Sequence, residues 1–170
     1  MRLNPSSVLA MIGLWLWLPV YTYALPSDSE KNMHITADST LLNYKTGFNL
    51  YEGNVKITQG ETRLTAERLT TQRNNNHKME EAIAYGTKTL AHYWTIPRKG
   101  DQVLHAKANI IKFYPLKSLV VLNGNVLVTQ GNNSFQGPEI IYNIKDQTVV
   151  SPPTKKGRAT IIVEQTKLES

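Results

Sequence analysis

An eight-residue block occurs twice in this chain and constrains the fold more than any other feature of the sequence. Gly53–Gly60 reads GNVKITQG and Gly124–Gly131 reads GNVLVTQG, so six of the eight positions are identical at an offset of 71 residues. Two further identities upstream share this offset: His34 with His105, and Ala37 with Ala108. Chance similarity between two hairpins is a poor explanation for an ungapped series of this kind. We therefore expect two copies of one β unit in a single elongated domain.

Apolar and polar residues alternate over short segments along most of the chain after Met33. This two-residue period is the pattern of strands with one buried face, and it is clearest in 48–51, 55–57, 126–128, 140–144 and 161–163. Turn residues recur about every 8–12 positions, as in antiparallel sandwiches and jelly rolls. Each repeat is expected to contain two short strands, a turn, a long strand that ends at a Gly-Asn turn, and another strand that reaches Thr-Gln-Gly. Met79–Tyr85 is compatible with a helix but spans only seven residues, and it is predicted to be a strand.

The N-terminus predicts export. Arg2 precedes an apolar run from Val8 to Val20, which is 13 residues long. That length suits the core of a signal peptide, whereas a membrane-spanning helix needs about 20 residues. Ala24 and Thr22 are small residues at the positions that a signal peptidase reads. We predict a signal peptide at 1–24, a flexible N-terminus at 25–32, one domain at 33–164 and a loose tail at 165–170; an uncleaved anchor is the alternative.

Several classes of enzyme site are disfavoured. The chain contains no cysteine, which excludes disulfides, thiolate zinc sites and thiol nucleophiles. Its four histidines lack the spacing of metal ligands, and the repeat mates His34 and His105 are expected to share a structural role. Glu80 and Glu81 are adjacent and would face opposite sides of a strand. We predict no enzymatic activity, no catalytic residues, no cofactor and no metal.

Further motifs follow the repeat in a fixed order. The series begins with His34-Ile35, Ala37-Asp38, Gly53-Asn54-Val55 and Thr58-Gln59-Gly60. It continues with Leu64–Leu69, Ala84-Tyr85-Gly86, Val120–Thr129, Gly137–Tyr142 and Lys156-Gly157-Arg158. They stand behind an export signal in a basic chain with 19 Lys and Arg against 13 Asp and Glu. The ordered series resembles the OstA-like family of periplasmic lipopolysaccharide-transport proteins of Gram-negative bacteria, over about residues 33 to 163. Leu90–Gly100 departs from the family pattern, and there we expect an aromatic hairpin that contains Ala91–Trp94.

The resemblance implies a fold and a function. The fold is an open, twisted, antiparallel β-jelly roll of about sixteen strands, whose two sheets meet in a V with an apolar interior. The function is a head-to-tail bridge of copies along which lipopolysaccharide slides, bound through its lipid A. One end would join the periplasmic subunit of the inner-membrane lipopolysaccharide transporter, and the other the outer-membrane insertion machine. A soluble, diffusing lipid carrier and a structural β protein without a ligand stay open as alternatives. The export signal and the scattered basic residues disfavour a nucleic-acid partner.

Strand alternation and charge predict the site residues. A multi-acyl lipid needs continuous apolar shelter, because each exposed CH₂ costs about 0.8 kcal/mol. The apolar groove is predicted to contain Met33, Ile35, Leu50, Val55, Ile57, Leu64, Leu69, Phe113, Val126, Val128, Phe135, Ile140 and Tyr142. Basic residues predicted at its mouth, to meet lipid phosphates, are Lys56, Arg63, Arg68 and Arg73. For each of these residues, ordinary core packing or a solvated surface is the alternative.

The first and last strands are predicted to be assembly edges. Residues 33–37 contain no proline and no inward lysine, and residues 159–163 are β-branched and uncharged. Neither segment has the devices that usually protect a sheet edge from pairing with another chain. The residues expected at these edges are Met33, Ile35, Ile161 and Val163.

Overall fold

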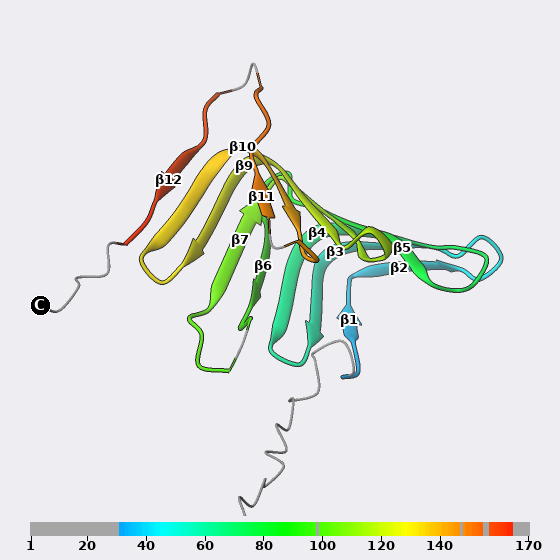
Figure 1. Ribbon diagram of the computed structural model, residues 1–170. Coiled ribbons are helices and arrows are strands. Elements are labelled where there is room, and N and C mark those ends of the chain that lie inside the picture. Colours follow the sequence, from blue (N-terminus) through cyan, green and yellow to red (C-terminus); the bar gives the residue numbers. More distant parts are fainter. Residues whose placement is uncertain (1–30, 98, 147, 155–156, 165–170) are drawn as a thin grey trace, which may run out of the picture.

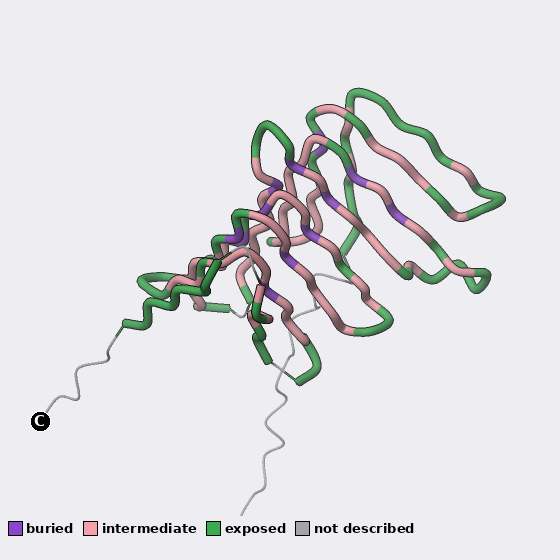
Figure 2. Tube along the Cα trace, turned by 90° about the horizontal axis from the view of Figure 1, so that it is seen from above, coloured by how far each residue is buried: buried purple, intermediate pink, exposed green. Residues whose placement is uncertain are grey.

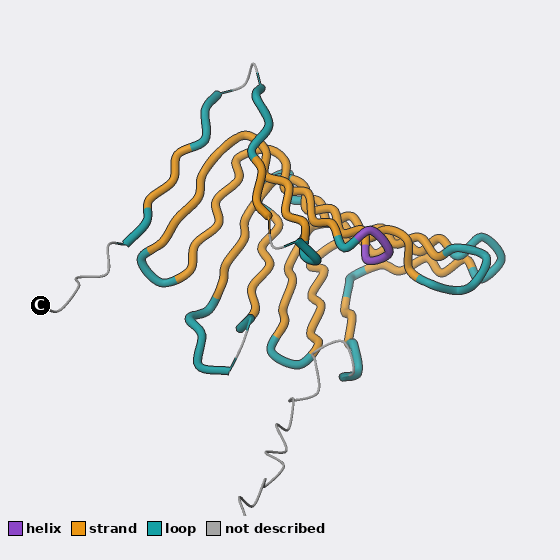
Figure 3. The backbone as a smooth tube through the Cα atoms, in the orientation of Figure 1, coloured by secondary structure: helices purple, strands orange, loops and turns teal. Residues whose placement is uncertain are grey.

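The computed structural model describes residues 31–97, 99–146, 148–154 and 157–164. The predicted signal peptide at 1–24, most of the predicted flexible segment at 25–32 and the tail at 165–170 lie outside the described residues. Strands make up most of the described chain, with a single turn of 3₁₀ helix, η2 (Pro115–Lys117), before the ninth strand (Figure 3). The strands are β1 (His34–Thr36), β2 (Ser39–Asn43), β3 (Phe48–Gln59), β4 (Thr62–Arg73), β5 (Met79–Tyr85), β6 (Ala91–Thr95), β7 (Leu104–Ala108), β8 (Ile110–Tyr114), β9 (Leu119–Gln130), β10 (Asn133–Asn143), β11 (Thr148–Val150) and β12 (Thr160–Ile162).

Four long strands organise the molecule, because each of them pairs with different neighbours along its two halves. β3 pairs with β2 near its start and with β1 near its end, and β9 pairs with β8 and β7 in the same way. β4 pairs with β6 and then β5, and β10 with β12 and then β11. The long strands thus cross between two sheets. Sheet A has the order β1-β3-β4-β6-β7-β9-β10-β12, and sheet B the order β2-β3-β4-β5-β8-β9-β10-β11.

The two sheets diverge from the line along which the long strands bend (Figure 1). All strand pairs in the described residues are antiparallel, as predicted, and Met79–Tyr85 is the strand β5. The expected number of about sixteen strands differs from the twelve continuous strands of the described chain. The difference arises because β3, β4, β9 and β10 each contribute a segment to both sheets. Each sheet therefore contains eight strand segments.

The internal repeat is visible in the strand boundaries. Adding the offset of 71 residues to the bounds of β2 and β3 gives the bounds of β8 and β9. His34 pairs with Thr58, and its repeat mate His105 pairs with Thr129, so the two histidines occupy equivalent positions in sheet A. The repeat therefore corresponds to one half of a single hydrogen-bonded fold.

The Gly-Asn pairs form bends inside strands, and the prediction of turns at these positions is wrong. Gly53 and Asn54 have φ angles of 74° and 47°, and Gly124 and Asn125 have 76° and 49°. Two successive left-handed residues form a bulge, which shifts the pairing register of β3 with β4 and bends the strand. Glycine and asparagine adopt this conformation more readily than other residues. β3 and β9 consequently continue through the bend and enter the other sheet.

Each bend is braced by a residue at the point where a neighbouring chain segment crosses between the sheets. The Asp38 amide donates to the Gly53 carbonyl at 2.9 Å, and its carboxylate accepts from Asn54 Nδ2 at 2.8 Å. Asn109, the repeat mate of Asp38, makes the same two contacts with the second Gly-Asn pair, at 2.8 and 2.9 Å. The amide bonds satisfy the carbonyls of Gly53 and Gly124, which the bulges remove from the strand ladder, and the side-chain bonds hold the two asparagines.

Glu67 of β4 holds the link between β5 in sheet B and β6 in sheet A. Its carboxylate accepts hydrogen bonds from the Thr87 hydroxyl and from the amides of Lys88 and Thr89, at 2.6 and 2.7 Å for the amides. The hydroxyl of Thr87 and the amide of Thr89 stabilise the anion most and lower the pKa of Glu67 to about 2. The carboxylate therefore stays charged and holds this link at neutral and mildly acidic pH.

Replacing Gly53 with alanine tests the bend. Gly53→Ala is expected to lower the free energy of unfolding by about 1–3 kcal/mol, because φ is +74° and the new Cβ would lie 2.9 Å from the Asp38 Cβ. Urea unfolding measures the change. Gly137→Ala in β10 is the control, since the nearest atom to a Cβ there is the Cα of Ala159 at 3.5 Å; its expected cost is under about 1 kcal/mol. Equal losses in the two variants would contradict the assigned role of the bend.

Candidate functional site

One row of inward side chains crosses all eight segments of sheet A. Cross-strand pairing joins Ile35, Ile57, Leu64, Tyr93, Ala106, Val128, Phe135 and Ile161 in that order. Ala106 belongs to the buried core, and all the others except Ile161 pack against it. No residue of the row is charged. An uninterrupted apolar row therefore runs from one edge of the sheet to the other.

Sheet B faces this row with two inward rows of its own. The row next to the bends contains Tyr51, Leu69, Ala84, Ile111, Leu122 and Ile140. The row farther from the bends contains Asn49, Thr71, Ala82, Phe113, Val120 and Tyr142. Asn49 Nδ2 donates to Thr71 Oγ1 at 3.2 Å, which satisfies the one polar pair of these two rows. The inner face of sheet B is thus mainly apolar as well.

Burial on the inner faces falls with distance from the bends. Val55 and Val126, next to the bends, are 1% and 0% exposed, and Ala91 and Ala108 are also fully buried there. Phe113, farther along its strand, is 37% exposed. Seen from above, the buried residues are short segments in the middle of the strands, with exposed residues toward the strand ends (Figure 2). The two sheets therefore pack closely near the bends and leave apolar side chains partly uncovered toward their ends.

Eleven of the thirteen predicted groove residues lie on this inner face. They are Ile35, Val55, Ile57, Leu64, Leu69, Phe113, Val126, Val128, Phe135, Ile140 and Tyr142. Leu50 does not: it pairs with Leu41 and Thr70 on the outer face of sheet B. The prediction failed there because the neighbouring inward position holds Asn49, a polar residue that Thr71 satisfies. Met33 precedes β1 and is 45% exposed.

The basic residues Lys56, Arg63 and Arg68 point away from the inner face, which corrects their predicted place at a groove mouth. Each is the chain neighbour of an inward residue, so strand alternation places it on the outer face. The Arg63 guanidinium donates to the carbonyls of Gly60 and Thr62, the latter at 2.9 Å. Arg63 thereby closes the β3–β4 turn.

The other two predicted mouth residues also have structural contacts. The Arg68 guanidinium lies 4.2 Å from the centroid of the Tyr85 ring on the outer face of sheet B, a cation–π contact. Arg73 is exposed at the end of β4, and its amide donates to the Gly47 carbonyl of the β2–β3 turn at 3.0 Å. Arg63 and Arg73 thus lie near opposite ends of β4.

Exposed apolar side chains gather at the two ends of the sheets. At one end, Leu41 and Leu42 of the edge strand β2 are 53% and 44% exposed. At the other, Ile161 of β12 is 60% exposed and Val163 just beyond it 69%. The edge strand β11 adds Val149 and Val150, and β12 also adds Ile162. In the described chain, each edge strand pairs with a neighbour on one side only.

Sequence reasoning missed several inward residues. Ile111 alternates in step with Phe113 in β8, and Val120 and Leu122 alternate in step with Val126 in β9, so the alternation is a usable signal for all three. Tyr51 and Tyr93 also pack against the core, and tyrosine is intermediate between the residue types that are usually buried and those that are usually exposed. The buried alanines gave no hydrophobic signal, although Ala37 and Ala108 are repeat mates. Small side chains at these positions allow the sheets to approach closely near the bends.

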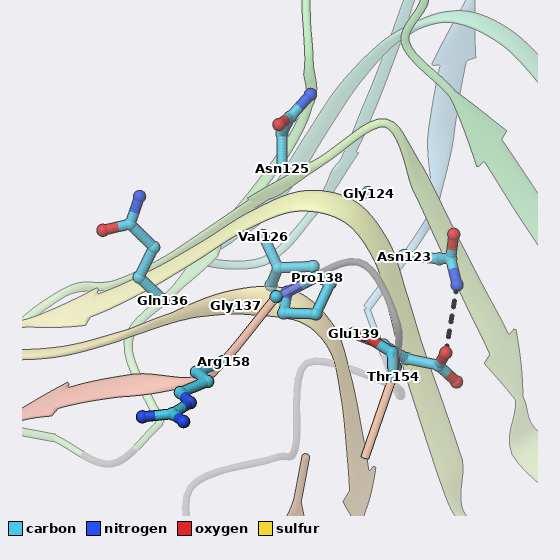
Figure 4. A pocket seen from close by; sticks show the side chains of 11 residues that line it. Asn123, Gly124, Asn125, Val126, Gln136, Gly137, Pro138, Glu139, Thr154 and Arg158 are labelled. Atoms are coloured by element: carbon cyan, nitrogen blue, oxygen red, sulfur yellow. Dashed lines mark hydrogen bonds between the residues drawn. The ribbon is translucent and has the colours of Figure 1, made fainter. Parts of the chain in front are cut away.

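A second, more polar space lies beside the bends of β9 and β10 (Figure 4). This cavity has a volume of about 690 Å³ and is lined by residues that include Asn125, Gln136, Glu139 and Arg158. Asn123 Nδ2 donates to Glu139 Oε2 at 3.3 Å along its wall. Its mixed polar lining distinguishes it from the apolar inner face.

The described residues contain no group of three or more His, Asp or Glu side chains placed to hold a metal ion. They also contain no helix with the length and apolar character needed to cross a membrane.

Comparison with known proteins gives a consistent set of relatives. The family model described as "LptA/(LptD N-terminal domain) LPS transport protein" matches residues 34–148. The lipopolysaccharide export system protein LptH of Pseudomonas aeruginosa is 34% identical over 137 residues, which cover 81% of this chain and 74% of LptH. The lipopolysaccharide export system protein LptA of Escherichia coli K12 is 26% identical over 169 residues, 99% of this chain and 89% of LptA.

A solved structure has the same fold. The crystal structure of Pseudomonas aeruginosa LptH, described as the LptA-homologous periplasmic component of a lipopolysaccharide transport device, superposes with a TM-score of 0.70. The match has 30% sequence identity and covers 82% of this chain and all of that chain. The predicted open jelly-roll architecture is confirmed by this similarity.

Two leucine substitutions test the assignment of inner and outer faces. Leu69→Ala should lower the free energy of unfolding by about 2–5 kcal/mol, because Leu69 is 2% exposed within the core. Leu50→Ala, on the outer face, should cost less than about 1.5 kcal/mol. Urea denaturation followed by circular dichroism gives both values. A loss at Leu50 as large as that at Leu69 would reverse the assignment of the two faces.

Proposed function

Because this chain belongs to the family of lipopolysaccharide transport proteins formed by LptA and the N-terminal domain of LptD, we propose that it carries lipopolysaccharide across the periplasm. In this proposal the inner faces of the two sheets form an apolar groove that shelters the acyl chains of lipid A. The saccharide stays outside the groove, in water. Copies of the chain stack head to tail, so that their grooves form one continuous path.

The observation that carries the proposal is the apolar row from Ile35 to Ile161 across sheet A. Seven steps between neighbouring strands, at about 4.8 Å each, make this row about 34 Å long. Apolar side chains on it are only partly covered within one copy, so acyl chains can add the missing cover. Each CH₂ sheltered there gains about 0.8 kcal/mol relative to water. A row without charge or interruption lets a lipid move along it without a large barrier.

The edges of the sheets support the head-to-tail arrangement. β1 and β2 leave backbone groups unpaired at one end, and β11 and β12 do so at the other. Strand addition at such edges would extend both sheets and bury the exposed apolar side chains of β2, β11 and β12. Because the two ends are different surfaces, the contact is heterologous and produces an open filament. Met33, Ile35, Ile161 and Val163 are the proposed residues of this contact.

The proposal also includes export to the periplasm and a docking partner at each end of the chain. Cleavage of the predicted signal peptide after Ala24 would release the chain into the periplasm. The N-terminal edge would dock on the periplasmic subunit of the inner-membrane lipopolysaccharide transporter, and the C-terminal edge on the outer-membrane insertion machine. This polarity comes from the family resemblance.

Site-specific photo-crosslinking tests the groove. A photoreactive residue in place of Ile57, Leu64 or Phe135 should capture lipopolysaccharide in cells, because these side chains face the groove. The same residue at Thr65 or Leu127, which face outward, should capture little or none. Immunoblots of the isolated adducts with an antibody against lipopolysaccharide measure the difference. Equal capture from both faces, or none from the inward positions of a folded protein, would contradict the proposal that the inner face binds lipopolysaccharide.

Light scattering over a wide concentration range tests the assembly. The mass of the intact protein should grow with concentration, whereas a variant that lacks residues 159–170 should stay monomeric because its C-terminal edge is missing. Circular dichroism checks that the truncated variant keeps its strands. An intact protein that stays monomeric at high concentration would contradict the bridge and favour the diffusing carrier.

A further inference from the structure

Two rows of outward side chains cross the middle of sheet A on the face opposite the apolar row. From β3 to β9, one row contains Lys56, Thr65, His92, Lys107 and Leu127, and the other Thr58, Arg63, Trp94, His105 and Thr129. None of these ten residues is a carboxylate, three are lysine or arginine and two are histidine. β6 and β7, which contribute the histidines, lie in the middle of this sheet (Figure 1). The outer face of sheet A therefore concentrates positive charge without a neighbouring acid in either row.

Three aromatic rings meet at the centre of this face. His92 Nε2 and His105 Nδ1 are 3.1 Å apart and share a hydrogen bond, with ring centroids separated by 5.2 Å. The ring of Trp94 lies 4.6 Å from that of His92, centroid to centroid, with 36° between the planes. A hydrogen bond between two imidazoles needs a donor N–H on one ring and a free lone pair on the other. The bond therefore persists when one of the two rings is protonated and is lost when both are.

The surroundings of His92 disfavour its charged form. Burial, the Lys107 ammonium and His105 all lower the pKa of His92, with burial the largest cause. Arg63 is occupied by the carbonyls of Gly60 and Thr62. The next outward carboxylate of β4, that of Glu67, already accepts hydrogen bonds from the link between β5 and β6.

We propose that His92, His105 and Lys107, beside the ring of Trp94, bind a phosphoryl group carried on a saccharide. This outer anion site lies on the face of sheet A that does not face the proposed groove, so it is independent of acyl-chain binding. A phosphoryl group would accept charge-assisted hydrogen bonds from the Lys107 ammonium and from a protonated histidine pair. The flat apolar face of the indole would pack against the sugar ring. Lys56 adds a further positive charge on the same row.

Nuclear magnetic resonance of the protein recovered from the periplasm tests the site directly. Glucose 6-phosphate, added up to roughly 20 mM, should shift the ring resonances of His92, His105 and Trp94 in a saturable way, whereas glucose should not. Inorganic phosphate should bind at least about threefold more weakly, since it lacks the sugar ring that packs on Trp94. Equal affinity for the two anions would overturn the saccharide part and identify the ligand as free phosphate. No shift with either anion would overturn the site.

A lysine substitution separates this site from general surface charge. Lys107→Gln should weaken glucose 6-phosphate binding by about tenfold, since it removes a charge-assisted hydrogen bond. Lys112→Gln, which changes an outward lysine of sheet B, is the matched control and should leave the affinity unchanged. Equal effects of the two substitutions would show diffuse attraction and contradict a defined site.

Sulfate tests the histidine pair, because its charge stays constant over the relevant pH range. Burial lowers the pKa of His92 most, and repulsion from Lys107 and His105 adds to it. An anion beside the pair would offset that repulsion, so binding should be coupled to proton uptake. Sulfate affinity should therefore fall as the pH rises from 5.5 to 8. An affinity that does not change with pH, yet is lost in Lys107→Gln, would assign binding to the lysine alone and overturn the role of the histidines.

Discussion

The architecture depends on strands that bend from one sheet into the other without losing their backbone hydrogen bonds. At the bends of β3 and β9, two left-handed residues leave the regular ladder, and the freed backbone groups need new partners. The amides of Asp38 and Asn109 donate to the glycine carbonyls of the two bends, and their side-chain oxygens accept from the asparagine side chains. Because the bends of β3 and β9 are formed and braced in the same way, the two repeats can share one continuous fold. The close packing near the bends and the divergence beyond them both follow from this geometry.

Much of this fold could be predicted from the sequence, and the errors of the prediction have physical causes. The two-residue period correctly indicated strands, and the offset of 71 residues correctly indicated two copies of one unit. From the sequence, Gly-Asn predicts a turn because both residues favour turns. In the structure, the same conformational freedom bends a strand that continues on the other side. Only long-range pairing with Asp38 and Asn109 distinguishes the two outcomes, and a local pattern does not contain it.

The candidate site was predictable where alternation is strict and unpredictable where a polar pair is buried. Ile57, Leu64 and Phe135 follow the period and lie on the inner face, while Leu50 does not because Asn49 and Thr71 satisfy one another inside. The same alternation explains the basic residues: Lys56 faces outward because its neighbour Ile57 faces inward. The histidine pair of sheet A joins residues 13 positions apart in sequence, and no sequence motif indicates that they meet.

The two faces of sheet A thus differ in chemistry, with an uncharged apolar row inside and a cationic, aromatic cluster outside. The central claim is that the inner row shelters acyl chains, and native mass spectrometry of the protein purified from a Gram-negative envelope tests it most directly. We expect a species heavier than the processed chain by the mass of lipopolysaccharide. This species should be lost in the folded variant Ile57→Asp, which places an unpaired charge in the apolar row. A folded protein that carries no lipid, or one that keeps its lipid in the Ile57→Asp variant, would contradict it.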